Sequence, residues 1–225
     1  NVGPHTGHHY SDFIPNEMRW RYSTRGQIPP DAHEIMMICA GEFIEAHMFA
    51  DSLAILGKPV RLLLPEIIPF YFTGTVKFGE VPKQSVKNLA DALGGLETFN
   101  VMPGYYGIYL DGGKPQRITS WGNFPRFVVS ALGRGGSDAT GQYLTVARAM
   151  ILRNMGRMDI VAHANFTDVE GVAVADPKLV ENVPYNKAIT YDDALALWSK
   201  VVHPLALEIA KEHTTPIIVR RSFTP

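Results

Sequence analysis

Leu132-Gly133-Arg134-Gly135-Gly136-Ser137-Asp138-Ala139-Thr140 is the stretch that decides the fold of this chain. Its three glycines can adopt positive φ and leave backbone N–H groups open to a ligand. Apolar residues at helical spacing follow over residues 140–154 and predict a helix, whose first N–H groups Ser137 or Asp138 can cap. Open amides and the helix dipole favour an anion here, and the Arg134 guanidinium suits a carboxylate. A glycine-rich turn with a surface arginine is the plainer alternative.

The composition is that of a globular protein. The chain has 225 residues, of which 46% are hydrophobic and 19% charged, and a formal net charge of −1. It is long enough for one sizeable core, so we expect a single domain over residues 1–225, with residues 1–30 irregular. Without a basic run, neither nucleic acid nor a membrane surface is an expected partner. No apolar stretch reaches the roughly 20 residues of a membrane helix, and we expect a cytoplasmic protein.

The only cysteine, Cys39, lies within an apolar helical pattern. A single cysteine excludes an internal disulfide and suits a reducing compartment. A buried, unreactive thiol is the expected state of Cys39, rather than a nucleophile.

One long helix is predicted over residues 32–56, with Asp31 as its cap and Gly57 as its end. Glu42 falls on the apolar stripe of this helix, where a carboxylate is costly unless something pairs with it. Alternatively, Glu42 sits at the edge of the stripe and reaches water. Among residues 1–30, the cluster of His5, His8 and His9 lacks the carboxylate or cysteine partners of a persuasive metal site.

Strands alternate with helices along the rest of the chain, which predicts a parallel or mixed sheet covered on both faces. Thr190 is expected to cap a helix, and His203-Pro204 to start the next one. The remaining strands are predicted at residues 59–64, 70–78, 99–110, 126–131, 158–164 and 216–220, and the remaining helices at 83–93, 191–200 and 204–213.

Ligands of an open α/β sheet bind beyond the carboxyl ends of its strands. Asp168 follows a predicted strand, where it can orient a lysine or bind a metal-bridged phosphate, although a simple turn explains it equally well. Lys200 ends its helix and complements the dipole there. A lysine beside an anion loop is also what phosphoryl transfer requires, since the moving group gains negative charge.

Several ordered motifs together resemble the aspartate kinases, a family with the amino-acid kinase fold. The glycine stretch is similar to the family's Leu-Gly-Arg-Gly-Gly-Ser-Asp signature, and the resemblance is dense from residue 132 to 225 and thinner from 31 to 107. The other matching stretches are Phe166-Thr167-Asp168-Val169-Glu170-Gly171 with Ala175-Asp176-Pro177, Ile189-Thr190-Tyr191-Asp192-Asp193-Ala194, Lys200-Val201-Val202-His203-Pro204, Pro216 with Arg220 to Pro225, Ala40-Gly41-Glu42 and Pro103-Gly104-Tyr105.

The resemblance implies a three-layer αβα sandwich with a mainly parallel central sheet. It also implies a kinase that uses ATP and Mg²⁺ to phosphorylate the side-chain carboxylate of L-aspartate, giving 4-phospho-L-aspartate. Alignment and charge neutralisation would supply most of the acceleration. Small molecules, the amino acid and ATP, would be the partners of a homo-oligomer.

Site residues carry over from the family position by position. Arg134, with Gly135, Gly136 and Ser137, would hold the substrate carboxylate, and Glu42 its ammonium group. Asp138 would orient a catalytic lysine, and Lys200 would act near the phosphates. The nucleotide site would be lined by Thr167, Asp168, Ala173, Lys178, Lys200 and Val201.

The chain departs from the family pattern in three places. The family's opening Lys-Phe-Gly-Gly-Thr strand and its C-terminal regulatory domains are absent from this sequence. Ala173 replaces a tyrosine expected near the base, which removes a stacking surface, and Lys178 replaces an arginine. Phe43 replaces an arginine after the Gly-Glu pair, and an aromatic insert occupies residues 118–127.

These departures leave two other functions open. One is a kinase of the same fold for another carboxylate or for a carbamate, which Phe43, Ala173 and the insert at residues 118–127 favour. The other is a nucleotide- or anion-binding homologue without catalytic activity, which the missing lysine motif favours.

Overall fold

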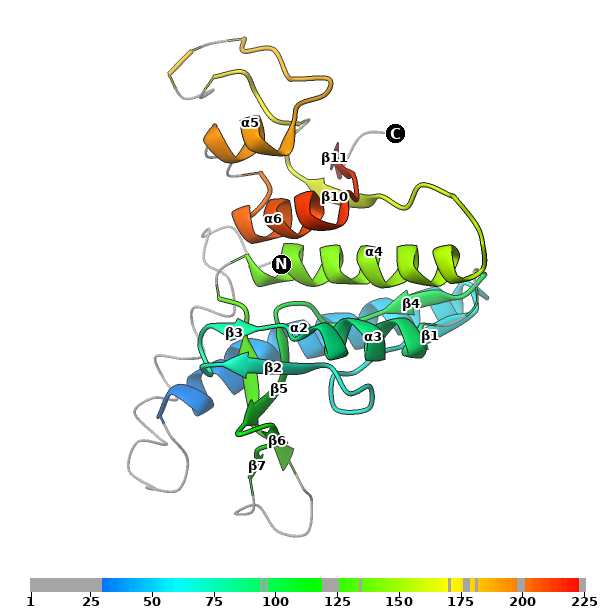
Figure 1. Ribbon diagram of the computed structural model, residues 1–225, viewed down its shortest axis with the longest axis vertical. Helices are drawn as coiled ribbons and strands as arrows, with labels where there is room; N and C mark the ends of the chain where they lie inside the picture. Colours follow the sequence, from blue (N-terminus) through cyan, green and yellow to red (C-terminus); the bar gives the residue numbers. More distant parts are fainter. Residues whose placement is uncertain are drawn as a thin grey trace. The chain divides into compact units, whose positions relative to one another are not determined.

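The computed structural model describes residues 30–93, 95, 97–118, 126–133, 135–169, 171–175, 179–180, 182–197 and 201–222. The chain divides into two compact units, Asn1–Ser137 and Asp138–Pro225, and each is described by itself (Figure 1). The predicted histidine cluster near the amino terminus and most of the aromatic insert lie outside the described residues. Whether the two units form one catalytic domain stays a prediction.

The described residues of the first unit form two complete helices and several short strands. In chain order its elements are α2 (Pro30–Ile55), β1 (Val60–Leu62), β2 (Tyr71–Gly74), β3 (Gly79–Glu80), α3 (Lys83–Ala92), β4 (Phe99–Val101), β5 (Tyr106–Asp111), β6 (Lys114–Pro115), β7 (Arg117–Ile118), β8 (Arg126–Phe127) and β9 (Val129–Ala131).

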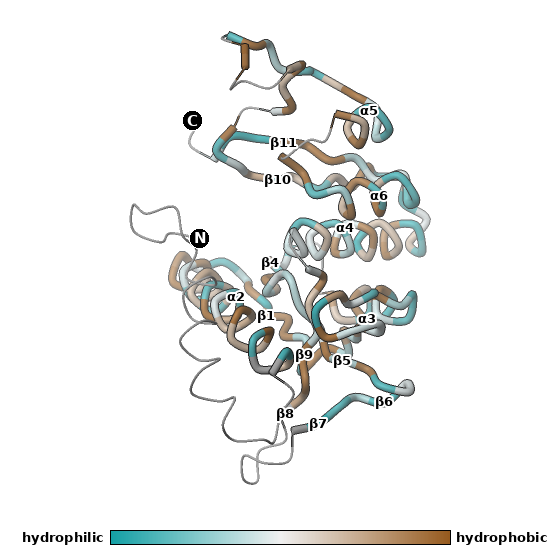
Figure 2. The backbone as a smooth tube through the Cα atoms, turned by 90° about the vertical axis from the view of Figure 1, so that its left-hand side faces the viewer, coloured by the Kyte–Doolittle hydropathy of each residue, from teal (hydrophilic) through white to brown (hydrophobic). Residues whose placement is uncertain are grey.

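The strands of this unit form a mixed sheet and two separate pairs. The five-stranded sheet runs β3-β2-β5-β6, with β9 also paired to β5; β2 and β5 are parallel, and its other pairs are antiparallel. β1 and β4 form a parallel pair, and β7 pairs with β8. Figure 2 shows α2 and α3 on opposite sides of β1, β5 and β9, so this unit has a helix–strand–helix layering.

Helix α2 follows the predicted span closely. Gly57 has φ +70°, and the N–H groups of Gly57 and Lys58 donate to the carbonyls of Ala54 and Leu53. Those two bonds satisfy carbonyls at the end of a helix and need a left-handed residue, which glycine supplies without strain. Asp31 lies in the first turn of α2 rather than capping it, because the helix begins at Pro30.

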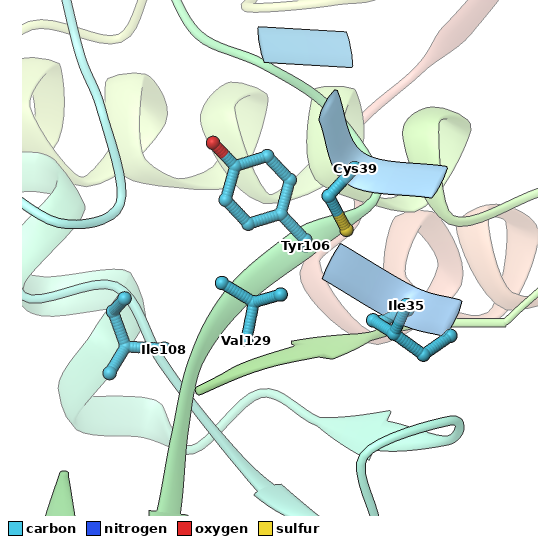
Figure 3. Close-up of a cluster of buried hydrophobic side chains, with 6 residues drawn as sticks. Ile35, Cys39, Tyr106, Ile108 and Val129 are labelled. Atoms are coloured by element: carbon cyan, nitrogen blue, oxygen red, sulfur yellow. The ribbon is translucent and has the colours of Figure 1, made fainter. Parts of the chain in front are cut away.

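The core of the first unit lies between α2 and the sheet. Ile35 and Cys39 of α2 face Tyr106 and Ile108 of β5 and Val129 of β9 (Figure 3). Cys39 is buried, as predicted, and burial followed by the charge of Glu42 raises the pKa of its thiol. A protonated thiol in an apolar core is a poor nucleophile.

The second unit carries the C-terminal motifs. Its elements are α4 (Gly136–Asn154), whose first two residues belong to the first unit, β10 (His163–Thr167), α5 (Tyr191–Ala196), α6 (Pro204–His213) and β11 (Ile217–Arg221). β10 and β11 are parallel, with His163 opposite Ile217. Ala194, Val202, Ala206 and Leu207 form a buried cluster against which Ile217 and Val219 of β11 pack.

Three local predictions for this unit have different outcomes. Thr190 caps α5 as predicted, because its side chain accepts a hydrogen bond from the Asp193 N–H. Helix α6 begins at Pro204, with His203 as its cap. The strand predicted at residues 158–164 is wrong in position: β10 starts at His163, and Met158 and Ile160 are 91% and 85% exposed.

The α/β fold class is confirmed, with parallel pairs in both units. Among the described residues, no helix combines the length and the apolar character needed to cross a bilayer.

Candidate functional site

Two of the predicted substrate-binding residues meet in the first unit. Ser137 Oγ donates a hydrogen bond to Glu42 Oε1 at 3.2 Å, although 95 residues separate the two in sequence. The backbone of Gly104 also lowers the pKa of the Glu42 carboxyl, so the two are close. Helix α2, the β4–β5 loop and the glycine loop therefore converge on one carboxylate.

Backbone space around this contact is narrow. A Cβ at Gly104 would lie 2.8 Å from Ser137 Oγ and 2.9 Å from its Cβ. A Cβ at Gly136 would lie 2.8 Å from the Leu132 Cβ. Since real Cβ atoms do not approach so closely, these two glycines are what allow the β4–β5 loop and the start of α4 to touch. Gly135, directly before α4, has φ +76°, a left-handed conformation that glycine adopts without strain.

Glu42 is half-buried, and its electrostatic surroundings are acidic. Burial raises the pKa of its carboxyl, Ser137 and Gly104 lower it, and the nearby Glu45 raises it further. Burial, with the charges of Glu34 and Glu42 among the causes, also raises the pKa of Tyr105 to about 12. No lysine or arginine of the described residues forms an ion pair with Glu42. A carboxylate in this setting is suited to an ammonium group from a ligand.

The neighbouring Asp138 has a different contact, within the second unit. Its Oδ2 accepts a hydrogen bond from the His203 N–H at 3.0 Å. Helix α4 starts at Gly136, so Ser137 and Asp138 lie in its first turn, and the prediction that one of them caps it was wrong. Both side chains instead make contacts with residues far away in sequence. That Asp138 orients a catalytic lysine stays a prediction.

Arg134, Lys178 and Lys200 lie outside the described residues. Two residues shortly after Lys200, Val201 and His203, have backbone groups that are held by hydrogen bonds. The Val201 carbonyl accepts a hydrogen bond from the Asn165 side chain at 3.1 Å, and the His203 N–H is held by Asp138. The Val201 side chain packs against the buried cluster of the second unit.

The predicted nucleotide segment begins where β10 ends. Thr167 Oγ1 donates to Asp168 Oδ1 at 3.0 Å, and the Thr167 carbonyl accepts hydrogen bonds from the N–H and hydroxyl of Ser222. These bonds fix Thr167 to the end of β11. Asp168 is exposed, so its carboxylate is open to a ligand.

Ala173 is the next predicted nucleotide-binding residue, and it pairs with Tyr185 in an antiparallel bridge. Tyr185 was not among the predicted site residues. The sequence does not predict the pairing of Tyr185 with Ala173. Residues 171–175 and 183–186 carry no alternating pattern that would indicate a pair of strands.

The described residues contain no group of three or more histidine, cysteine, aspartate or glutamate side chains placed to hold a metal. Mg²⁺ in phosphoryl transfer needs less, because it is bound by one or two carboxylates together with the phosphates of the substrate. The exposed carboxylate of Asp168 fits that mode of binding.

The second unit also contains a polar network that the sequence does not predict. Gln142 Oε1 lies 3.1 Å from His163 Nδ1, and Gln142 Nε2 donates to Thr215 Oγ1. A Cβ at Gly141 would lie 2.8 Å from His163 Nε2, so the ring sits directly on α4. The network links α4, β10 and the turn before β11, which makes it a structural feature of this unit.

Known proteins similar to this chain are aspartokinases. The aspartokinase of Mycolicibacterium smegmatis is 27% identical over 199 residues, which is 87% of this chain and 41% of the relative. The aspartokinase of Geobacillus stearothermophilus is 40% identical over 98 residues, 42% of this chain and 22% of the relative. No protein-family model matches the chain.

Solved structures give the same result for the fold. E. coli aspartokinase III, in complex with aspartate and ADP, aligns over 93% of this chain and 42% of its own, with a TM-score of 0.67 and 21% identity. Aspartate kinase from Synechocystis aligns over 95% of this chain and 31% of its own, with a TM-score of 0.63 and 22% identity. The resemblance to aspartate kinases that the motifs predicted is confirmed, and so is the fold. This chain spans about two fifths of the M. smegmatis relative.

Proposed function

We propose that this chain is the aspartate-phosphorylating part of a kinase, which transfers the γ-phosphoryl group of ATP to the side-chain carboxylate of L-aspartate. The observation that carries the proposal is the contact between Ser137 and Glu42. It joins two motifs from distant parts of the sequence around a half-buried carboxylate, where the resemblance to aspartate kinases implies amino-acid binding.

The acidic surroundings of Glu42 match one end of the substrate. The ammonium group of an α-amino acid would pair with the Glu42 carboxylate, which Ser137 holds in place by a hydrogen bond. Charge-assisted hydrogen bonds of this kind are about twice as strong as neutral ones. Arg134, Gly135 and Gly136 would bind the substrate carboxylate through the guanidinium and the backbone amides.

The second unit would bind the nucleotide. Thr167, Asp168 and Ala173 would line its site, and the cationic side chains of Lys178 and Lys200 would neutralise phosphate charge. Asp168 would hold Mg²⁺, which supplies further charge neutralisation when bound. Asp138 would position a catalytic lysine. The carboxylate of aspartate attacks the γ-phosphorus directly, so no covalent intermediate with the protein is required. ADP and the acyl phosphate are the products.

A hydroxamate assay tests the proposal directly. Hydroxylamine traps an acyl phosphate as a hydroxamate, so the full-length gene product incubated with ATP, Mg²⁺ and aspartate should form aspartyl hydroxamate. Omitting ATP gives the background. Absence of hydroxamate above that background from a folded, full-length protein would rule the proposal out.

A second candidate is a kinase for another carboxylate or for a carbamate. Phe43, next to Glu42, favours it, because the Phe43 ring is 37% exposed and packs on His47, with 4.2 Å between ring centroids. Phe43 stands where the aspartate kinase pattern has an arginine, and a site without that charge would suit a less polar substrate. A thermal-shift screen of amino acids separates the two candidates, since the true substrate stabilises the folded protein most strongly.

A further inference from the structure

The proposed nucleotide segment is one strand of a short antiparallel ribbon. Ala173 and Tyr185 form its bridge. The Val174 N–H donates to the Pro184 carbonyl at 3.1 Å, and the Asn186 N–H donates to the Val172 carbonyl at 2.9 Å. Hydrogen bonds on both sides make Ala173 and Tyr185 a non-hydrogen-bonded pair, in which the two side chains lie on the same face and close together.

The tyrosine ring lies against small residues of the opposite strand. A Cβ built on Gly171 would be 3.8 Å from both Cβ and Cδ1 of Tyr185, and Ala173 carries only a methyl group. Neither residue is large enough to cover the ring. Tyr185 accordingly keeps 39% of its surface exposed, although its backbone is fixed by the ribbon.

We propose that Tyr185 is a nucleotide-binding residue whose ring stacks on the base of the nucleotide bound at Thr167, Asp168 and Ala173. This inference rests on the proposed function, because it needs a nucleotide at that segment. A planar aromatic side chain held by backbone pairing offers a surface that every base can stack on, and such stacking is largely insensitive to the identity of the base.

The assignment changes the meaning of Ala173. Taken from the sequence alone, its methyl group indicates the loss of a stacking surface from the nucleotide site. In the ribbon, positions 173 and 185 present their side chains on the same face, so a ring at 185 occupies the same side of the ribbon as a ring at 173. A small residue at 173 then leaves room for the ring at 185 and for the base.

Calorimetric titration of the full-length gene product with ADP and with inorganic tripolyphosphate tests this role. Tyr185→Ala should weaken ADP binding about 5- to 100-fold, which is the range that the loss of one base–aromatic stack produces. Tripolyphosphate has no base to stack, so its affinity should stay the same. The conservative variant Tyr185→Phe should bind ADP as the wild type does, since it keeps the ring.

Moving the aromatic ring from position 185 to position 173 tests most directly whether the ring itself binds the base. The double variant Ala173→Tyr with Tyr185→Ala should recover most of the ADP affinity lost in Tyr185→Ala. Tyr185→Leu provides a second test if the alanine variant does not fold, because it keeps apolar volume without a π face. Ile218→Ala, which removes an exposed side chain from β11 of the same unit, is the matched control.

Three results would overturn the inference. If Tyr185→Ala or Tyr185→Leu bound ADP as tightly as the wild type, a stacking role for Tyr185 would be excluded. Equal weakening of ADP and tripolyphosphate would show that Tyr185 only supports the fold of the segment. If the wild-type protein bound neither ADP nor ATP, the proposed function itself would be ruled out, and this inference with it.

Discussion

Asp138 Oδ2 accepts a hydrogen bond from the His203 N–H at 3.0 Å, which ties the first turn of α4 to the residue that caps α6. The carboxylate therefore lies next to the amino terminus of α6, where the helix dipole favours negative charge. We expect Asp138→Ala to lower the free energy of unfolding by about 1–2 kcal/mol, because the His203 N–H loses its acceptor. Asp138→Asn keeps an acceptor and should cost less. Urea unfolding of both variants measures this, and equal losses would contradict it.

Glu42→Gln should separate substrate binding from stability. The variant removes the charge that would pair with the ammonium group, so the KM for aspartate should rise about 10- to 100-fold. Burial raises the pKa of Glu42 in the folded protein, so folding opposes ionisation of its carboxyl. The ionised carboxylate therefore lowers the free energy of unfolding, and this loss is fully present above the folded pKa. At neutral pH the glutamine variant should therefore melt at a higher temperature than the wild type. A lower Tm together with an unchanged KM would count against both parts.

Gly104→Ala should destabilise the protein by about 1–3 kcal/mol, because the new Cβ would overlap Ser137. It should also weaken aspartate binding, since Ser137 must move away from Glu42. Gly41→Ala is the matched control: this glycine lies in α2 with nothing within 4 Å of a built Cβ. The control should gain about 0.5–1 kcal/mol, because alanine favours a helix over glycine. Denaturant midpoints of the two variants should move in opposite directions.

Acidification should weaken the second unit through His163. Burial lowers the pKa of this imidazole below its ordinary value of 6.5, and the charge of Asp138 acts weakly in the other direction. The unfolded chain then binds a proton at a pH where the folded chain does not. The stability contributed by neutral His163 is fully present above 6.5 and is lost as the pH falls through the folded pKa. Urea unfolding from pH 7.5 to 5 measures the slope, and His163→Gln should flatten it. An unchanged slope would exclude His163 as its source.

Thr190→Ala should cost about 1 kcal/mol of stability, because the Asp193 N–H loses its acceptor at the start of α5. Thr190→Ser retains the hydroxyl and should stay within a few tenths of the wild type. Chemical unfolding followed by circular dichroism reports both values. Serine as damaging as alanine would mean that the methyl group, rather than the cap, matters at this position.

The sequence predicted those elements whose signals are local. Gly57 ends α2 through its own positive φ, Thr190 caps α5 through its own hydroxyl, and Pro204 starts α6 through its fixed φ. Each of these signals acts within one helical turn. They can therefore be interpreted without knowing which segments pack together.

The errors arise where long-range contacts compete with local rules. Ser137 and Asp138 have the chemistry of caps, but their oxygen atoms are used by Glu42 and the His203 N–H. The apolar run at residues 158–164 suggested a strand, yet pairing with β11 starts only at His163. Hydropathy indicates which residues can be buried, whereas the register is set by the partner strand.

The candidate site was predicted in part. Motif order identified Glu42 and Ser137 as members of one site, and their contact is observed. Tyr185 could not be found in this way, because its assignment depends on a bridge to Ala173 that only the folded chain reveals.

The tight approach of Gly104 to Ser137 restricts how the proposed amino-acid site can change. A larger side chain at position 104 would push Ser137 away before it reached any ligand, so this position offers no route to a new preference. Phe43 on α2 can be replaced without such a collision, since its ring is more than a third exposed. Natural divergence or laboratory selection for other acidic metabolites should therefore accumulate changes along the helix and leave the loop glycine intact.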